Sequence, residues 1–236
     1  MYLSVIIPAY KEEKVIESTL RSIDAYLKRQ TYDYEVLVVV DGVKDKTADL
    51  AKKFSKDLNL RIIKEEKRGR GAARARGFKE AKGEIILSTD ADVSLYSGWI
   101  ETMVSEIKKD SIAVTTPCKI IDRSALNNLF FNYSLPVFMT IYRIVFGHFW
   151  LSGFSFGIKK DIYLKSGGFD SSLHAQEDTD LSFRVAKLGK IKFLNKPITV
   201  SGRRLKDGIF AAYFDYWRSY FNFFVLKKNG YLDNPR

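Results

Sequence analysis

The first half of the chain alternates short apolar runs with longer amphipathic stretches. The runs are typical of buried strands, and the stretches repeat apolar residues at helical spacing. Because the two kinds of segment alternate, the pattern predicts βαβ units that share one mostly parallel sheet. The expected strands are Leu3 to Pro8, Glu35 to Val40, Leu60 to Lys64, Glu84 to Ser88 and Ile112 to Thr116, and the expected helices are Glu12 to Lys28, Lys46 to Ser55, Gly71 to Ala81 and Ser97 to Lys108.

The alternation stops near Ile120, where an uncharged run from Ser124 to Tyr142 repeats apolar residues at helical spacing. Polar residues within the run and the flanking Arg123 and Arg143 leave its apolar length short of the roughly 20 residues that a membrane span needs. We therefore expect a buried or membrane-surface helix here rather than a span.

The segment from Ile209 to Leu226 is strongly aromatic, with basic residues before and after it. It fits a helix lying on anionic lipid, and it equally fits a helix packed on the sheet. No linker or repeat interrupts the chain. We expect one domain over residues 1–205, followed by an amphipathic helical extension over residues 206–236 that packs on the domain or on a membrane surface.

Composition narrows the class of protein. A 236-residue chain with 46% hydrophobic residues excludes a disordered tail. The net charge of +11 predicts an anionic partner, which could be nucleic acid, a lipid surface or a phosphorylated small molecule. The single cysteine excludes an intrachain disulfide framework. The first residues lack the basic region and the cleavage site of a secretory signal, so we expect the protein in the cytoplasm.

Candidate chemistry follows the expected strands, because ligands of open parallel sheets bind at the carboxyl ends of the strands. Asp90 and Asp92 follow one buried strand, and paired carboxylates suit Mg²⁺ or Mn²⁺ bridging phosphates. The segment from Arg68 to Gly77 offers glycines and arginines to a phosphate, although it matches neither a Walker loop nor a dinucleotide fingerprint.

A third cluster places Glu177, Asp178 and Asp180 in the first turn of an expected amphipathic helix. One acid there is explained by helix capping. Three acids exceed what a cap needs, which favours an acid–base role for at least one of them.

In this order, the clusters resemble the family 2 glycosyltransferases of the nucleotide-sugar-dependent GT-A type. The resemblance covers about residues 3–205 and implies a Rossmann-like α/β fold, an open and mostly parallel sheet flanked by helices, here with the C-terminal aromatic helix added. The motifs that carry it are Ser4 to Tyr10 with Glu12, Asp41-Gly42, Gly71 to Arg74, Asp90-Ala91-Asp92, Gly167 to Asp170, and Glu177 to Leu181 with Arg184.

The resemblance implies a role for each matching position. Asp178 would be the catalytic base of an inverting displacement, and Asp90 and Asp92 would hold the metal, Mg²⁺ or Mn²⁺, and the donor diphosphate. Glu177 and Asp180 would support the acceptor or the helix. Arg203 and Arg204 either stabilise the leaving diphosphate or belong to the basic flank of the aromatic helix. The remaining donor-site positions are Pro8, Ala9, Tyr10, Glu12, Asp41 and Arg74.

The sequence thus predicts a metal-dependent, inverting glycosyltransferase that moves one sugar from a UDP- or GDP-sugar to a glycan or lipid-linked acceptor. We expect it in the cytoplasm or peripherally on the cytoplasmic face of an anionic membrane. The chain lacks the Gln-x-x-Arg-Trp motif of polysaccharide synthases, which favours single transfer. Two alternatives stay open: an enzyme like the dolichyl-phosphate sugar synthases, and a basic nucleic-acid-binding protein, which no motif supports.

Overall fold

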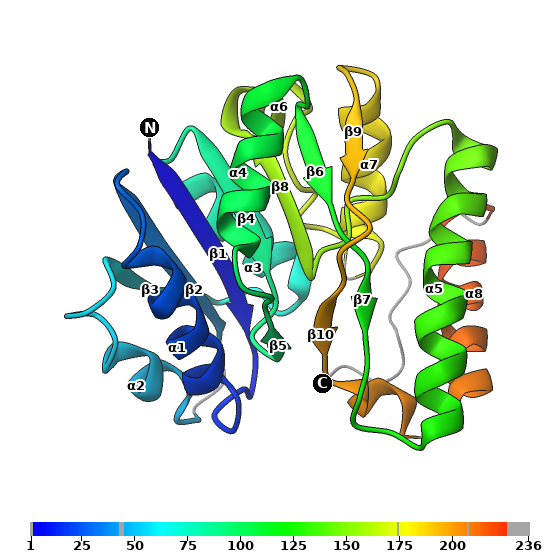
Figure 1. Ribbon diagram of the computed structural model, residues 1–236, viewed down its shortest axis with the longest axis horizontal. Coiled ribbons are helices and arrows are strands. Elements are labelled where there is room, and N and C mark those ends of the chain that lie inside the picture. The colour runs from blue at the N-terminus through cyan, green and yellow to red at the C-terminus, as the bar shows by residue number, and fades with distance from the viewer. Residues whose placement is uncertain (1, 43–44, 174, 207, 226–236) are drawn as a thin grey trace.

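An open seven-stranded sheet forms the centre of the molecule (Figure 1). The computed structural model describes residues 2–42, 45–173, 175–206 and 208–225. The sheet has the strand order β3-β2-β1-β4-β8-β6-β9. Its strands are β1 (Leu3–Ala9), β2 (Tyr34–Asp41), β3 (Leu60–Glu65), β4 (Ile85–Thr89), β6 (Ala113–Thr115), β8 (Ser155–Lys159) and β9 (Ile191–Phe193).

Most neighbouring strands in this sheet run parallel, as the alternating pattern predicts. The exception is β8, which lies between β4 and β6 and is antiparallel to both. The predicted fold class, an open and mostly parallel α/β sheet flanked by helices, is confirmed. The antiparallel strand was not predicted from the sequence.

Helices cover both faces of the sheet because successive strand residues point to opposite sides. Val5 and Ile7 belong to the core beneath α1, α2 and α4, whereas Ile6 belongs to the core beneath α3, α6 and α7. These helices are α1 (Ile16–Leu27), α2 (Thr47–Lys52), α3 (Arg70–Glu80), α4 (Trp99–Lys109), α6 (Lys160–Lys165) and α7 (Glu177–Ala186).

The first helix begins later than predicted, at Ile16 instead of Glu12. Lys11 has a φ of 56°, so the backbone turns directly after β1 and cannot enter a helix there. The backbone N–H of Glu12 instead donates a hydrogen bond to the Thr47 hydroxyl at 2.9 Å. The turn keeps Glu12 at the carboxyl end of β1.

A small second sheet of order β5-β10-β7 lies beside the carboxyl end of β4. Within it, β10 pairs antiparallel with β5 and parallel with β7. Its strands are β5 (Val93–Ser94), β7 (Cys118–Lys119) and β10 (Ile198–Val200). This sheet joins the acidic loop after β4 to the last third of the chain.

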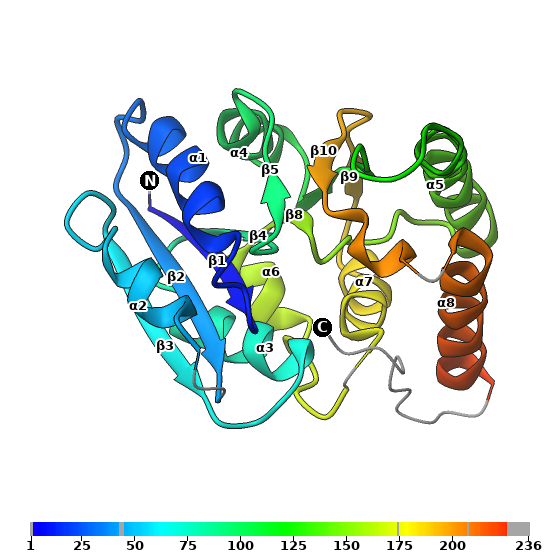
Figure 2. The same cartoon turned by 90° about the horizontal axis from the view of Figure 1, so that it is seen from below.

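Two long helices, α5 (Ala125–Phe146) and α8 (Ile209–Phe224), lie side by side at one end of the molecule (Figures 1 and 2). Ring contacts join them along their length, from Phe130–Phe210 through Phe138–Tyr220 to Phe146–Phe224. A short 3₁₀ turn, η1 (Gly202–Leu205), leads into α8. The aromatic helix therefore packs on α5. The interpretation that placed it on the main sheet differs from this arrangement.

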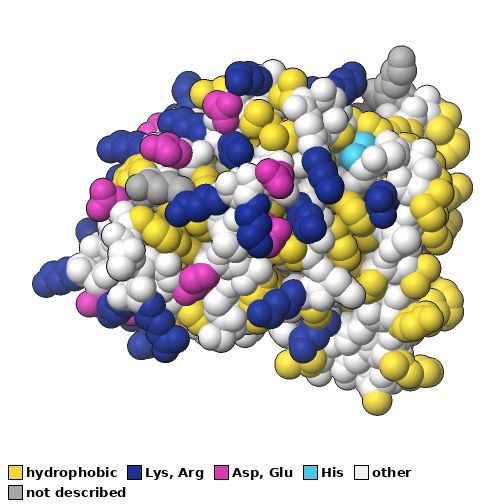
Figure 3. All heavy atoms as spheres, turned by 45° about the horizontal axis from the view of Figure 1, so that its top comes forward, with side chains coloured by type: hydrophobic (Ala, Val, Ile, Leu, Met, Phe, Trp, Pro, Cys, Tyr) yellow, Lys and Arg dark blue, Asp and Glu magenta, His cyan; other side chains and the backbone are white. Residues whose placement is uncertain are grey.

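The length expected for the uncharged helix was too short. α5 continues to Phe146 as one helix of 22 residues with Pro136 inside it. It is the one helix in the described parts of the chain with the length and apolar composition to cross a membrane, and 11% of its most apolar window is buried. Hydrophobic side chains gather along this side of the molecule in Figure 3.

Candidate functional site

The acidic loop after β4 carries Asp90 and Asp92 to the carboxyl edge of the sheet. Asp90 is 6% exposed, and the side chain of Asp92 is 7% exposed. The loop is held in place because Ser201 donates a backbone hydrogen bond to the carbonyl of Asp92 at 3.3 Å. Both carboxylates line the same cavity. The structure therefore brings together the two residues that the sequence predicts as metal ligands.

Arg74 lies in the interior of the site, with 1% of its surface exposed. Its guanidinium donates to Asp90 Oδ1 at 2.8 Å and to the carboxylate of Glu177. The loop before β8 approaches so closely that a Cβ at Gly153 would lie 2.5–2.8 Å from guanidinium atoms. Arg74 thus ties the acidic loop to the start of α7.

Asp178 faces the loop before β8 from the first turn of α7. Its carboxylate accepts hydrogen bonds from the backbone N–H groups of Gly153 at 3.0 Å and Thr179 at 2.8 Å. Burial, followed by the charge of Glu177, raises the pKa of Asp178 to about 6, against the opposing effect of Arg74. A carboxylate with this pKa is ionised at neutral pH and can still take up a proton, as a general base must.

The other two acids of α7 have arginine partners. Glu177 is 2% exposed and pairs with Arg74, and Asp180 pairs with Arg184 one turn further along the helix. Arg184 also donates to the Ser166 carbonyl at the end of α6, so Asp180 supports the packing of α6 against α7. Asp178 has no salt bridge within the described ranges of the chain.

Another buried carboxylate, that of Glu12, binds Arg203 from the last part of the chain. Glu12 is 0% exposed, and Arg203 donates to both of its oxygens, with Nη1 at 3.0 Å from Oε2. Nη2 of Arg203 also lies 2.9 Å from Asp92 Oδ2. Arg203 therefore connects the end of β1 to the acidic loop, an arrangement that sequence spacing cannot reveal.

Three more of the predicted donor-site residues lie at the end of β1 or directly after it. Pro8 and Ala9 pair with Val39 and Val40 of β2. Tyr10 is partly buried, and Lys11 Nζ lies 5.4 Å from the centre of its ring. The side chains of Asp41 and Arg204 lie outside the described part of the structure.

A cavity of about 650 Å³ extends from Asp90 and Asp92 between α5, α8 and the small sheet. Half of the residues that line it are aromatic, and most of the others are aliphatic or small. Tyr142 of α5 and Tyr220 of α8 line it, and burial together with the nearby Asp178 charge raises the pKa of both hydroxyls. Tyr142 and Trp150 were not predicted as site residues, because an aromatic residue within an apolar segment is ordinarily interpreted as part of the hydrophobic core.

Two carboxylates are few for a self-sufficient metal site, and the described residues contain no group of three side chains that could hold an ion. Mg²⁺ and similar hard ions are often bound by one or two carboxylates together with substrate phosphates. Asp90 and Asp92 therefore fit a metal that arrives with a diphosphate.

Comparison with known proteins matches residues 4–165 to the profile "Glycosyl transferase family 2". The probable glycosyltransferase YdaM of Bacillus subtilis is 32% identical over 216 residues, covering 84% of this chain and 50% of that protein. A dolichyl-phosphate beta-glucosyltransferase of Trichomonas vaginalis is 33% identical over 135 residues, covering 54% of this chain and 41% of that protein. The chain thus spans about half or less of the length of these curated relatives.

A solved structure shares the fold. It is a mannosyltransferase from Pyrobaculum calidifontis in complex with GDP-Man and Mn²⁺, which superposes with a TM-score of 0.63 at 23% identity. The match covers 92% of this chain and 59% of that one.

Proposed function

Because the chain belongs to glycosyl transferase family 2, we propose that it transfers a single sugar from a nucleotide-diphosphate sugar to an acceptor hydroxyl with inversion at the anomeric carbon. The observation that carries the proposal is Asp178, a carboxylate with a raised pKa and no salt bridge in the described structure. It binds Gly153, which lies against the Arg74 guanidinium that holds Asp90 of the acidic loop. The donor base, uracil or guanine, is left to experiment.

Different residues of the chain have different roles in the proposed transfer. Asp178 takes the proton of the acceptor hydroxyl while that oxygen bonds to the anomeric carbon and the bond to the diphosphate oxygen breaks. The proton ends on Asp178 and the electron pair on the leaving diphosphate. We assign Pro8, Ala9, Tyr10 and Asp41 to the nucleoside end of the donor.

Asp90 and Asp92 are the residues that would hold Mg²⁺ or Mn²⁺, an ion that neutralises charge on the diphosphate when bound. The similar mannosyltransferase structure, which contains Mn²⁺, supports this choice. Arg203 and Arg204 follow β10, and we assign their guanidinium groups to the same leaving group. Arg74 and Glu177 act on substrate through the position of the acidic loop and of α7.

We propose a lipid-linked acceptor and a peripheral position on the cytoplasmic face of a membrane. The relative named as a dolichyl-phosphate glucosyltransferase and the exposed apolar residues of α5 and α8 support this choice over a soluble glycan. Residues 1–205 would then form the catalytic domain, and residues 206–236 a C-terminal extension that includes α8, the helix packed on α5.

The test is a panel of UDP- and GDP-sugars with Mn²⁺, scored by thermal stabilisation of the protein and by slow hydrolysis of the sugar. We expect one donor to score in both assays. Asp178→Asn should lower transfer about 10²- to 10⁴-fold and leave donor affinity nearly unchanged. Asp161→Asn, on the exposed surface of α6, is the matched control. Undiminished transfer by Asp178→Asn would remove Asp178 from the mechanism.

A further inference from the structure

We propose that the cavity between α5 and α8 holds the hydrocarbon tail of the acceptor lipid, and that Tyr142 and Trp150 hydrogen-bond its polar head. This inference rests on the proposed function and assigns the acceptor side of the same site. It makes the substrate a single amphiphile whose two ends are recognised by different parts of one cavity.

The shape and lining of the cavity suit a tail. Its volume of about 650 Å³ falls within the roughly 300–1,000 Å³ typical of small-molecule sites. Phe138 and Val145 of α5, Phe221 of α8 and Val200 of β10 are among the residues that line it. A cavity with apolar walls favours apolar guests over water. A saccharide hydroxyl would find few partners along these walls.

Two polar groups that line the cavity are available to a head group. Tyr142 is 3% exposed, and its hydroxyl and the Trp150 indole N–H have no hydrogen-bond partner among the described residues. A buried donor without a partner costs about 1–3 kcal/mol, so both groups favour a ligand that accepts hydrogen bonds. The indole can only donate, which selects an oxygen-rich head such as a phosphate or a hydroxyl.

The Tyr142 hydroxyl also lies within range of the Asp178 charge, which adds to the effect of burial in raising its pKa. The hydroxyl therefore stays protonated and remains a donor at neutral pH. A head group bound by Tyr142 would therefore lie within range of the charge of the proposed base. Asp90 and Asp92 line the same cavity, so donor and acceptor would meet at this end.

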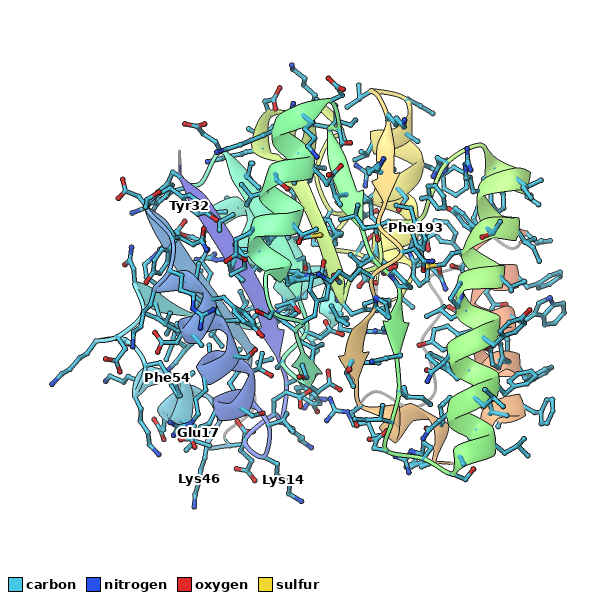
Figure 4. The ribbon with its side chains drawn as sticks, viewed as in Figure 1. Lys14, Glu17, Tyr32, Lys46, Phe54 and Phe193 are labelled. Carbon is cyan, nitrogen blue, oxygen red and sulfur yellow. The ribbon has the colours of Figure 1, made fainter. Side chains whose placement is uncertain are left out.

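The outer sides of the two helices identify a bilayer as the source of the tail. Leu126, Leu129 and Ile144 of α5 are 75%, 69% and 77% exposed, and Phe210 and Trp217 of α8 are 78% and 62% exposed. In Figure 4 side chains project outward from both helices, away from the sheet. A lipid can therefore pass from a membrane against these faces into the cavity behind them. Residues 226–236 are a poor occupant, because they carry four charged side chains: Lys227, Lys228, Asp233 and Arg236.

The test measures binding of one probe, 2,3-dibromohexadecyl phosphate, below its micellar concentration. Bromine near the head quenches nearby tryptophan, and Trp150 and Trp217 line the cavity whereas Trp99 is buried in the core. The reporter protein is the full chain with Trp217→Phe, which removes the surface indole. We expect saturable quenching of Trp150, and competition by unbrominated hexadecyl phosphate.

Three variants in the reporter protein locate the probe. Ala212 lines the cavity and its neighbour Ala211 is exposed on the same helix, so Ala212→Phe fills the cavity while Ala211→Phe is the matched control. We expect Ala212→Phe to weaken binding about tenfold or more, and Ala211→Phe to leave it unchanged. Tyr142→Phe keeps the ring, and its loss of one hydrogen bond should weaken binding about 2- to 10-fold. This variant keeps the test valid if Ala212→Phe does not fold.

Three outcomes overturn the inference. The first is no saturable quenching. The second is equal loss of binding in the Ala211→Phe and Ala212→Phe variants, which would indicate surface adsorption only. The third is a probe-independent dimer seen by sedimentation, which would assign the cavity and the exposed faces to a second copy of the chain. Donor binding is measured separately by calorimetry with Mn²⁺. Tail binding without donor binding would refute the proposed function alone, and donor binding without tail binding would refute this inference alone.

Discussion

Three acidic side chains begin α7, and the structure gives each of them a different environment. Glu177 pairs with buried Arg74 and Asp180 with Arg184, whereas the Asp178 carboxylate accepts hydrogen bonds only from backbone N–H groups among the bonds described. The cluster was recognisable in the sequence because capping a helix explains only one acidic residue, and this helix begins with three. It could not separate the roles of the three, since Arg74 lies 103 positions from Glu177 along the chain.

The rate of transfer should depend on pH through Asp178. Its pKa is raised to about 6, so the carboxylate is protonated below that pH and cannot accept a proton, and the rate falls as the pH drops through 6. Glu177→Gln removes a negative charge that contributes to the raised pKa, so the acid limb should move to lower pH. The measurement is kcat/KM against pH for both proteins.

Asp161→Asn is the control for that profile, because Asp161 pairs with Lys165 on the exposed face of α6. Its acid limb should coincide with that of the unmodified protein. An acid limb that stays in place in Glu177→Gln would show that another group titrates.

At the scale of elements, patterns with a clear period predicted structure well. Apart from the two-residue β5 and the later start of α1, the strands and helices before residue 110 lie close to where apolar runs and helical spacing place them. β8 was missed because Ser155–Lys159 contains Gly157 and follows an aromatic loop, so no alternation marks it. The strands β5, β7 and β9 are two or three residues long, too short to carry any period. The pairing of α5 with α8 depends on tertiary contacts that no local pattern encodes.

The start of α3 depends on a glycine. A Cβ at Gly71 would lie 2.2 Å from the carbonyl oxygen of Leu173, a backbone atom that cannot swing aside. Gly71→Ala should therefore push α3 away from the segment before α7 and cost about 1–3 kcal/mol of unfolding free energy, measured in urea. Donor affinity should also fall, because Arg74 moves with the helix.

Lys79→Ala provides the comparison, since Lys79 is exposed near the end of the same helix. Its urea midpoint and donor affinity should match those of the unmodified chain. Equal stability of Gly71→Ala would mean that this close approach is not part of the packing.

At the scale of the whole molecule, the exposed apolar residues are concentrated on α5 and α8 (Figure 3). Soluble surfaces seldom gather large apolar side chains in one region without a partner. The net charge alone is compatible with several kinds of anionic partner. The structure shows in addition an exposed apolar surface on α5 and α8. Their combination favours a lipid surface over nucleic acid, and this preference can be measured.

We expect the protein to float with phosphatidylglycerol vesicles. Exchanging Leu129 and Phe214, which are 69% and 61% exposed, for Asp should weaken vesicle binding by about tenfold or more, since each loses roughly 1.5–3 kcal/mol of apolar burial. The thermal midpoint should not change, because neither side chain is buried. Unchanged flotation of the double variant would assign binding to the basic residues alone, and binding would then fail at high salt.

The central position of β8 bears on the order in which the protein can form. β4 and β6 each bond to β8 and not to one another, yet β8 is made after both of them. During synthesis on the ribosome the first four strands can therefore assemble as a unit, while β6 waits for residues 155–159 to emerge. Until then the newly made α5 and its apolar surface have no sheet to anchor them, and this is the stage at which the nascent chain is most exposed to aggregation or to early capture by a membrane.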